Sequence, residues 1–98
     1  MFIALSVFEV ANGMEDEVKQ AFVKRPHLVD DAAGFLEMKV LSPQDNGSEI
    51  WVMTYWEDDN SYNVWYKDHM KEAHQGIPKG LKLVPGSMKV RFFDQVSR

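Results

Sequence analysis

The chain has 98 residues, a net charge of -4 and no cysteine, so one domain is expected and disulfides are excluded. Hydrophobic residues make up 45% of it, which excludes a disordered chain. The apolar runs are too short for a membrane span, and the acidic balance argues against a nucleic-acid binder. Residues 1–13 lack a basic segment and include Glu9, so we expect no signal peptide and a cytoplasmic protein.

The first third of the chain predicts a strand and two helices. Residues 2–10 carry apolar side chains on both faces, which is typical of a strand buried on both sides. Asn12, with Glu15 three residues later, fits a capping box, and Pro26 ends the helix that follows. A second short helix is expected after Pro26, with Gly34 as its C-terminal stop.

The remaining elements are two more strands, a long helix and a last strand. Residues 35–42 and 87–96 alternate, and each has one charged face, whereas residues 49–56 are apolar on both faces. Acidic residues from Asp58 predict the start of a helix that extends to about His74. A loop rich in Gly, Pro and Lys joins this helix to the last strand.

The resulting β-α-β-β-α-β order is the ferredoxin-like pattern, an α+β fold with one antiparallel four-stranded sheet across residues 1–98. Its first and third strands are central, which agrees with the two strands that are apolar on both faces. Helices cover only one side of such a sheet. Six Phe, three Trp and three Tyr give the chain more apolar surface than one small core buries, so we expect a homodimer in which a second copy covers the other side.

The most distinctive segment contains four residues in a characteristic spacing: Trp56, Tyr62, Trp65 and His74. With the opening strand, the Asn-Gly turn before the first helix, Gly34-Phe35 and the Ala73-His74 pair, it resembles the antibiotic-biosynthesis-monooxygenase (ABM) superfamily. Within that superfamily it is similar to the IsdG-type haem-degrading monooxygenases. The resemblance covers nearly the whole chain and implies a single ABM-type domain whose dimer forms an α/β barrel.

By position, the resemblance also implies a haem site. His74 matches the histidine that ligates haem iron, and Trp65 matches the tryptophan that presses on the macrocycle and distorts it. Lys79 or Lys82 would lie in a mobile flap and pair with the propionates. Ser6 stands where the haem degraders have an asparagine near the iron-bound oxygen, and its hydroxyl can donate a shorter-reaching hydrogen bond.

The function implied is a monooxygenase that degrades haem with O₂ and an external electron donor, haem being both cofactor and substrate. One alternative is a cofactor-independent ABM monooxygenase that acts on quinols or polycyclic phenols. Another is a non-catalytic dimer that binds a small apolar ligand. Ordinary structural roles are also open: Trp65 as a core or interface residue, and His74 as a histidine stabilised by the helix dipole.

Helix geometry adds a condition to the haem site. Nine residues on an unbroken helix turn the chain through about 900°, so Trp65 and His74 would point in opposite directions. We therefore predict a helix break at Lys67-Asp68, where Asp68 can cap a new short helix. In a straight helix, His69 is the better neighbour of Trp65, at i, i+4.

Overall fold

The computed structural model describes residues 1–24, 28–73 and 78–98. It confirms the predicted α+β class and the β-α-β-β-α-β order, with one additional 3₁₀ turn. The elements in chain order are β1 (Phe2–Glu9), α1 (Glu15–Val23), η1 (Leu28–Asp31), β2 (Phe35–Leu41), β3 (Glu49–Trp56), α2 (Asp59–Ala73) and β4 (Lys89–Asp94). The predicted last strand is thus shorter than expected at both ends, and the short second helix is a 3₁₀ turn followed by Gly34 at φ 80°.

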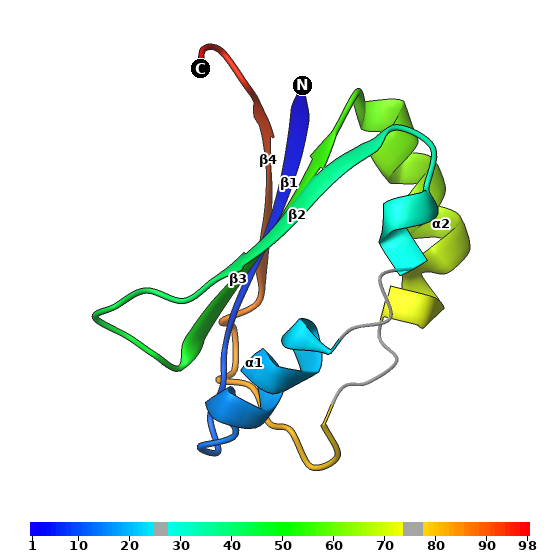
Figure 1. The fold of residues 1–98 in the computed structure, drawn as a ribbon. Helices are drawn as coiled ribbons and strands as arrows, with labels where there is room; N and C mark the ends of the chain where they lie inside the picture. The colour runs from blue at the N-terminus through cyan, green and yellow to red at the C-terminus, as the bar shows by residue number, and fades with distance from the viewer. Residues whose placement is uncertain (25–27, 74–77) are drawn as a thin grey trace.

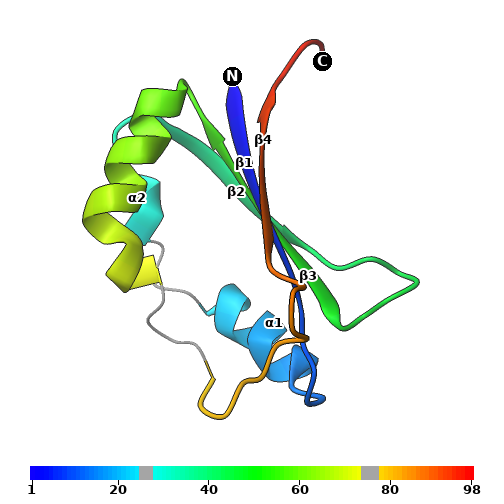
Figure 2. The same ribbon diagram turned by 180° about the vertical axis from the view of Figure 1, so that it is seen from behind.

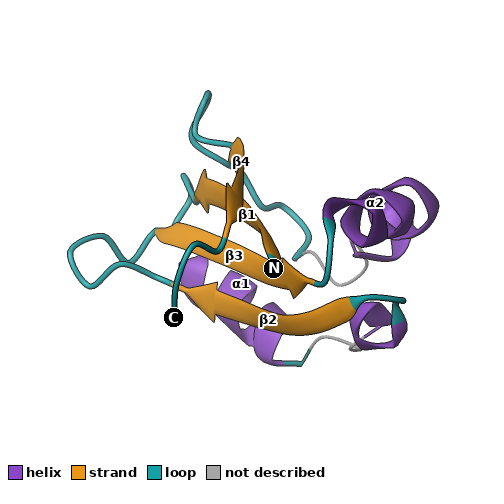
Figure 3. Ribbon diagram, turned by 90° about the horizontal axis from the view of Figure 1, so that it is seen from above, coloured by secondary structure: helices purple, strands orange, loops and turns teal. Residues whose placement is uncertain are grey.

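The four strands form one antiparallel sheet in the order β2-β3-β1-β4, which can be followed from bottom to top in Figure 3. The prediction that the first and third strands are central is therefore confirmed. In the register, Ser6 of β1 lies between Val52 of β3 and Val90 of β4. Because paired residues point to the same face, these three side chains lie on one side of the sheet.

Both long helices lie on the same side of the sheet, to the right in Figure 1 and to the left in Figure 2. We call this the helix side; on β1 it carries the even-numbered residues, such as Ala4 and Ser6. The open side carries the odd-numbered residues of β1 and their partners on β3. Its central apolar residues are Ile3, Leu5, Val7, Trp51, Met53 and Tyr55.

The buried residues of the helix side form two separate clusters. The aromatic cluster has Ala4, Val29, Trp56 and Tyr62 at its centre, packed against Phe2, Ala32, Phe35, Met38 and Trp65. The aliphatic cluster has Val10, Val18 and Ile50 at its centre, packed against Phe8, Met14, Phe22, Val40, Val52, Leu81 and Leu83. Along β1, Ser6 falls between the two clusters.

The predicted cap of the first helix is wrong. α1 begins at Glu15, its N-cap is Met14, and no side chain caps it. The Asn12 amide instead donates to the carbonyl oxygen of Gly80 at 2.7 Å, and its side-chain oxygen accepts from the Lys82 backbone N–H at 3.4 Å. Asn12 therefore fastens the loop before β4 to the end of β1, and three acidic residues in the first turn of α1 complement the helix dipole.

The predicted break in the second helix is also wrong, because α2 continues without interruption from Asp59 to Ala73. Sharp breaks generally need Pro, Gly or an inserted residue, and an interior Asp costs a helix only about 0.7 kcal/mol. The prediction that acidic residues from Asp58 mark the start of this helix is confirmed, because α2 begins at Asp59. Asp58 accepts hydrogen bonds from the Ser61 backbone N–H at 2.8 Å and from its hydroxyl at 2.7 Å. Within the ranges that the structure describes, the helices are all too short or too polar to cross a bilayer.

Candidate functional site

Trp56 is the centre of the aromatic cluster and is completely buried. Its indole N–H donates to the Thr54 hydroxyl at 2.8 Å, so the polar atom of this large side chain is satisfied. The Trp65 ring lies 5.6 Å from the Trp56 ring, and the Tyr62 ring lies 5.8 Å from it in an edge-on arrangement. Trp65 is itself only half-buried, so it connects the core to the surface.

The start of α2 fixes the position of Trp65. Tyr62 and Trp65 are three residues apart, so they lie on the same helix face, which is turned toward Trp56. Gly34 anchors that helix: its carbonyl oxygen accepts from the Glu57 N–H at 2.9 Å. A Cβ atom at Gly34 would lie 2.5 Å from Ser61 Cβ and closer still to its hydroxyl, so this close approach requires glycine.

The aromatic cluster is exposed on the side of β4. Phe92 stacks on Phe2 with ring centroids 5.6 Å apart, contacts the Tyr62 ring edge-on, and is 56% exposed. Val90, on the same face of β4, is 50% exposed. Sequence reasoning placed both on one face of the last strand but did not assign them to a site. The cluster thus offers an accessible apolar and aromatic surface between β4 and α2, suited to a flat ligand.

Ser6 lies on this same side of the sheet, four residues along β1 from Phe2, a distance of about 13 Å. Among the described residues, nothing forms a hydrogen bond with its hydroxyl. The end of α2 lies eight residues after Trp65, about 12 Å along the helix axis. Figure 1 shows α2 running from the end of the sheet near the N-terminus toward its middle, so both displacements have the same direction.

The predicted iron ligand, His74, lies outside the described residues and directly follows the last residue of α2. The unbroken helix means that no bend at Lys67-Asp68 turns the chain between Trp65 and His74. Residue 69 follows Trp65 by four positions within the same unbroken helix. Both histidines therefore stay candidates for the ligand.

The loop that was expected to form a mobile flap is fastened over its described part, residues 78–86. The Ala11 N–H donates to the carbonyl oxygen of Lys82 at 2.8 Å, and the Val84 N–H donates to that of Glu9 at 2.8 Å. Together with the bonds of Asn12, these contacts hold exposed Lys79 and Lys82 beside the aliphatic cluster. Their pairing with propionates stays a prediction.

Tyr62 is the site residue with a perturbed acidity. Burial raises the pKa of its hydroxyl, and the neighbouring Tyr66, whose ring is 5.8 Å away, contributes to the rise. A buried phenol disfavours its charged form, so Tyr62 is neutral at physiological pH. Its role in the described structure is apolar packing against Trp56, Trp65 and Phe92.

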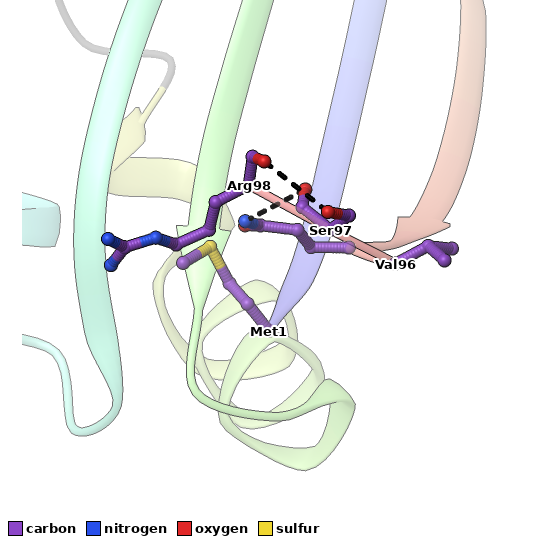
Figure 4. A pocket seen from close by; sticks show the side chains of 5 residues that line it. Met1, Val96, Ser97 and Arg98 are labelled. Carbon is purple, nitrogen blue, oxygen red and sulfur yellow. Dashed lines mark hydrogen bonds between the residues drawn. The ribbon is translucent and has the colours of Figure 1, made fainter.

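Two surface hollows lie near the chain ends, away from Ser6 and Trp65. One, of about 480 Å³, is lined by Met1, Phe2, Glu57, Asp58, Asp59, Asp94 and Gln95. The other, of about 270 Å³, is lined by Met1 and residues 95–98 (Figure 4). Its side-chain hydrogen bonds join near neighbours: the Gln95 amide donates to the Ser97 carbonyl oxygen, and the Ser97 hydroxyl donates to the Arg98 carbonyl oxygen. The Gln95 backbone N–H also donates to the Met1 carbonyl oxygen at 3.0 Å, which joins the two ends of the chain. Neither hollow includes Ser6, Trp65, Lys79 or Lys82, and the larger one meets the aromatic cluster only at Phe2.

Comparisons with known proteins agree on one family. The family model for antibiotic biosynthesis monooxygenases matches residues 1–76. A mycobilin-producing haem oxygenase of Mycobacterium tuberculosis is 30% identical over 74 residues, which cover 76% of this chain and 70% of that protein.

Solved structures show the same fold. The haem degrader MhuD from Mycobacterium tuberculosis, with two haems bound in its active site, superposes with a TM-score of 0.81 at 24% identity, covering 100% of this chain and 98% of that one. A Deinococcus radiodurans protein proposed as an antibiotic biosynthesis monooxygenase gives a TM-score of 0.76 at 11% identity, covering 100% and 95%. At these identities the likeness concerns the fold alone.

Proposed function

The chain belongs to the antibiotic biosynthesis monooxygenase family, and within it we propose a haem-binding monooxygenase that degrades haem with O₂ and an external electron donor. Support for the haem comes first from the 30% identical relative, which is a haem oxygenase. The observation that carries the proposal is the position of Trp65. It lies half-buried at the accessible edge of an aromatic cluster, on the same side of the sheet as Ser6.

The described residues fit a porphyrin. A macrocycle is flat and apolar over most of its surface, and the rings of Trp65 and Phe92, which pack on the buried ring of Tyr62, provide an aromatic surface of that character. A ligand that extends from Phe2, in the aromatic cluster, to Ser6 spans about 13 Å along the sheet, a length that suits a large ring system.

Each candidate residue has a distinct task in this proposal. Trp65 presses on the macrocycle, and His74, or His69 in its place, supplies a neutral imidazole to the iron. The Ser6 hydroxyl donates a hydrogen bond on the β1 side, and Lys79 or Lys82 pairs with the propionates. Bound haem itself supplies the activation of O₂ and is the molecule that is oxidised, while the chain binds, orients and distorts it.

The open side of the sheet supports a homodimer. The central strands present Ile3, Val7, Trp51, Met53 and Tyr55 there, none of them covered by a described helix. A contiguous apolar surface of this kind generally marks an interface. We propose that a second copy covers it, so that the two sheets pack face to face in a dimeric α/β barrel.

Titration with haemin tests the function. We expect a red-shifted Soret band that saturates at a fixed haemin-to-subunit ratio, and bleaching of that band when ascorbate is added under O₂. His74→Ala should abolish the ligand-dependent shift, while His69→Ala serves as the matched control and is expected to retain it. A Soret band that never shifts contradicts the proposal, and a shift lost only in His69→Ala reassigns the iron ligand.

Ser6→Asn tests the position where the resemblance implies an asparagine in the haem degraders. The longer amide extends farther from β1 than a hydroxyl, so we expect faster bleaching with unchanged haemin affinity. Equal bleaching rates in Ser6→Asn and Ser6→Ala would show that this position has no part in turnover.

A second candidate is a cofactor-independent monooxygenase acting on quinols or polycyclic phenols. The Ser6 hydroxyl favours this second function. Within residues 1–24, 28–73 and 78–98 the hydroxyl has no hydrogen-bond partner, and Ser6 lies on the helix side of the sheet, which also carries the aromatic cluster. Such a hydroxyl can bond a phenolic substrate directly. O₂ uptake by haem-free protein with a panel of quinols tests this function, and uptake at the background rate across the panel excludes it. Binding of haemin without bleaching or uptake would indicate a non-catalytic ligand-binding dimer.

A further inference from the structure

The open side of the sheet carries opposite charges at two different margins. Glu9 and Glu49 lie at one end of the two central strands, paired directly across from each other in the register. Lys89 and Arg91 lie on β4, level with Val7 and Leu5. The apolar residues of β1 and β3 separate these two pairs, so one surface contains both an acidic end and a basic edge.

The carboxylates of Glu9 and Glu49 repel each other. Directly opposed like charges destabilise a pair of strands. Their described hydrogen-bond partners are neutral: the Asn46 side-chain amide donates to Glu9 at 3.3 Å, and the Trp51 indole N–H donates to Glu49. In the part of the chain that the structure describes, neither carboxylate forms an ion pair. A cation from outside would therefore be bound favourably at this end.

The cationic side chains of β4 also lack an ion-pair partner among the described residues. The Arg91 guanidinium lies 5.1 Å from the Phe93 ring, and neither Arg91 nor Lys89 forms an ion pair with a described carboxylate. Lys39, at the opposite edge on β2, differs from them. Its ammonium is 3.8 Å from a Glu37 carboxylate oxygen and 5.5 Å from the Tyr55 ring, so its charge is already compensated.

Only one relative orientation of two such sheets pairs these charges. If a two-fold axis parallel to the strands relates the sheets, Glu9 faces the partner's Glu49, and Arg91 faces the edge that carries the partner's Lys39. An axis perpendicular to the strands brings Arg91 opposite the partner's Lys89. Rotating the sheets by about 90° in one sense brings the acidic end of each copy to the β4 edge of the other. The opposite sense brings it to the β2 edge, where Lys39 is already paired with Glu37.

The dimensions agree with the crossed arrangement. Glu9 is four residues from Leu5 along β1, about 13 Å, and β4 is one strand from β1 and two from β3, about 5 to 10 Å across the sheet. The long side chains of Lys89 and Arg91 extend over the difference. A two-fold axis makes the contact reciprocal, so each dimer gains two such clusters.

Resting on the homodimer proposed above, we propose that Glu9 and Glu49 of one subunit pair with Lys89 and Arg91 of its partner, and that this pairing sets the crossed orientation of the two sheets. The apolar centre supplies the area of the interface, and the four charges select its orientation. The occupant of the open side is a second copy, because the surface complements itself in charge, which a uniformly acidic or basic partner would not match.

Sedimentation velocity on charge-reversal variants tests the pairing. Glu9→Lys/Glu49→Lys and Lys89→Glu/Arg91→Glu should each raise the dimer dissociation constant by about tenfold or more, since both leave like charges facing each other. The variant with all four reversals should return to within about threefold of the original constant, because the charges are exchanged but still opposite. Glu17→Lys/Asp45→Lys, exposed and away from the open side, is the control with the same charge change and should have no effect.

Circular dichroism on each variant separates a loss of dimerisation from a loss of folding. If a charge-reversal variant does not fold, Glu9→Gln/Glu49→Gln is used in its place, and we expect it to weaken the dimer. A dimer unaffected by either reversal, or four reversals no better than two, overturns the pairing. A monomeric original chain overturns it as well. Haemin titration of the same samples is an independent readout, so failure of the pairing and failure of the haem proposal can be told apart.

Discussion

The aromatic and aliphatic clusters occupy the same side of the same sheet but differ in how they are closed. At the aliphatic end, Leu81 and Leu83 cover Val10 and Ile50, and Asn12 holds that loop in place. At the aromatic end, none of the described residues covers the corresponding edge beside β4, and Phe92 is 56% exposed. One end therefore resembles an ordinary core, while the other combines a core with an accessible surface.

The difference shows how a chain of 98 residues provides a binding surface without a second domain. Trp56, which is buried and hydrogen-bonded, supports this surface from beneath, and Trp65, which packs on it, is the accessible part. Preorganised rings lose little entropy on binding. Changes in the aromatic cluster should therefore affect both stability and ligand binding, and changes in the aliphatic cluster stability alone.

The largest expected effect is from Trp56→Ala, compared with Ile50→Ala. Both side chains are fully buried, and we expect losses of about 4 kcal/mol and about 3 kcal/mol in the free energy of unfolding. Urea denaturation measures both. Only Trp56→Ala should also weaken haemin binding under conditions where it is folded, because it removes the support of Trp65; equal affinities in the two variants would contradict the division of roles.

The second-largest effect is expected from substituting a glycine with positive φ, and two such glycines can be compared by the free energy of unfolding that each substitution costs. Gly34→Ala introduces a Cβ against Ser61 as well as backbone strain at φ +80°, with an expected cost of about 3 kcal/mol. Gly13→Ala has a similar φ of +74° and open space around the added atom, so about 1 kcal/mol is expected. Urea denaturation should rank them in this order. A Gly34→Ala cost no greater than that of Gly13→Ala would argue against the close approach of Gly34 to α2.

A smaller effect is expected from Asn12→Ala at the aliphatic end. The substitution removes the hydrogen bonds to Gly80 and Lys82, with an expected loss of about 1 kcal/mol. Hydrogen exchange of the Ala11 and Val84 amides should accelerate, while exchange in β3 should change only as far as global stability does. Unchanged protection of both amides would show that Asn12 does not hold the loop.

The smallest effect is the pH dependence of the cap of α2. Hydrogen bonds from the Ser61 hydroxyl and backbone N–H hold the pKa of Asp58 below its ordinary value of 3.8. The lowered pKa means that the stabilisation is fully present above pH 3.8 and is lost as the pH falls through the folded-state pKa. Asp58→Asn should lower Tm by a few degrees at pH 7 and make no difference well below that pKa. A Tm difference that persists in strong acid would contradict this origin.

Sequence patterns predicted the strands because the polarity of each face persists over many residues. β1 and β3 are apolar on both faces and central, whereas β2 and β4 each have one charged face and lie at the edges. Such predictions failed where two local patterns compete. Asn12 followed by Glu15 fits a helix cap, but its partners, Gly80 and Lys82, are remote in the sequence. Asp68 fits a cap equally well, yet α2 continues through it because nothing nearby interrupts the helix.

The candidate site was predictable only in part, because some of its contacts join residues that are remote in the sequence. Trp65 was identified through the resemblance of its segment to the ABM superfamily, but Phe92 joins the aromatic cluster only through the pairing of β4 with β1, which no local pattern specifies. The division of the helix side into two clusters likewise depends on where α1 and α2 lie over the sheet. Tertiary placement, rather than residue type, distinguishes the accessible cluster from the closed one.

The central claim is that a porphyrin binds at the aromatic cluster on the helix side. The three tryptophans test it directly, because Trp51 lies on the open side, Trp56 in the core and Trp65 at the accessible edge. Their indole N–H signals, assigned with single Trp→Phe variants, can be followed by NMR during titration with diamagnetic gallium protoporphyrin. The account predicts that the ring current shifts the Trp65 signal most, that of Trp56 less and that of Trp51 least. A largest shift at Trp51, or no shift at Trp65 on saturation, would contradict it.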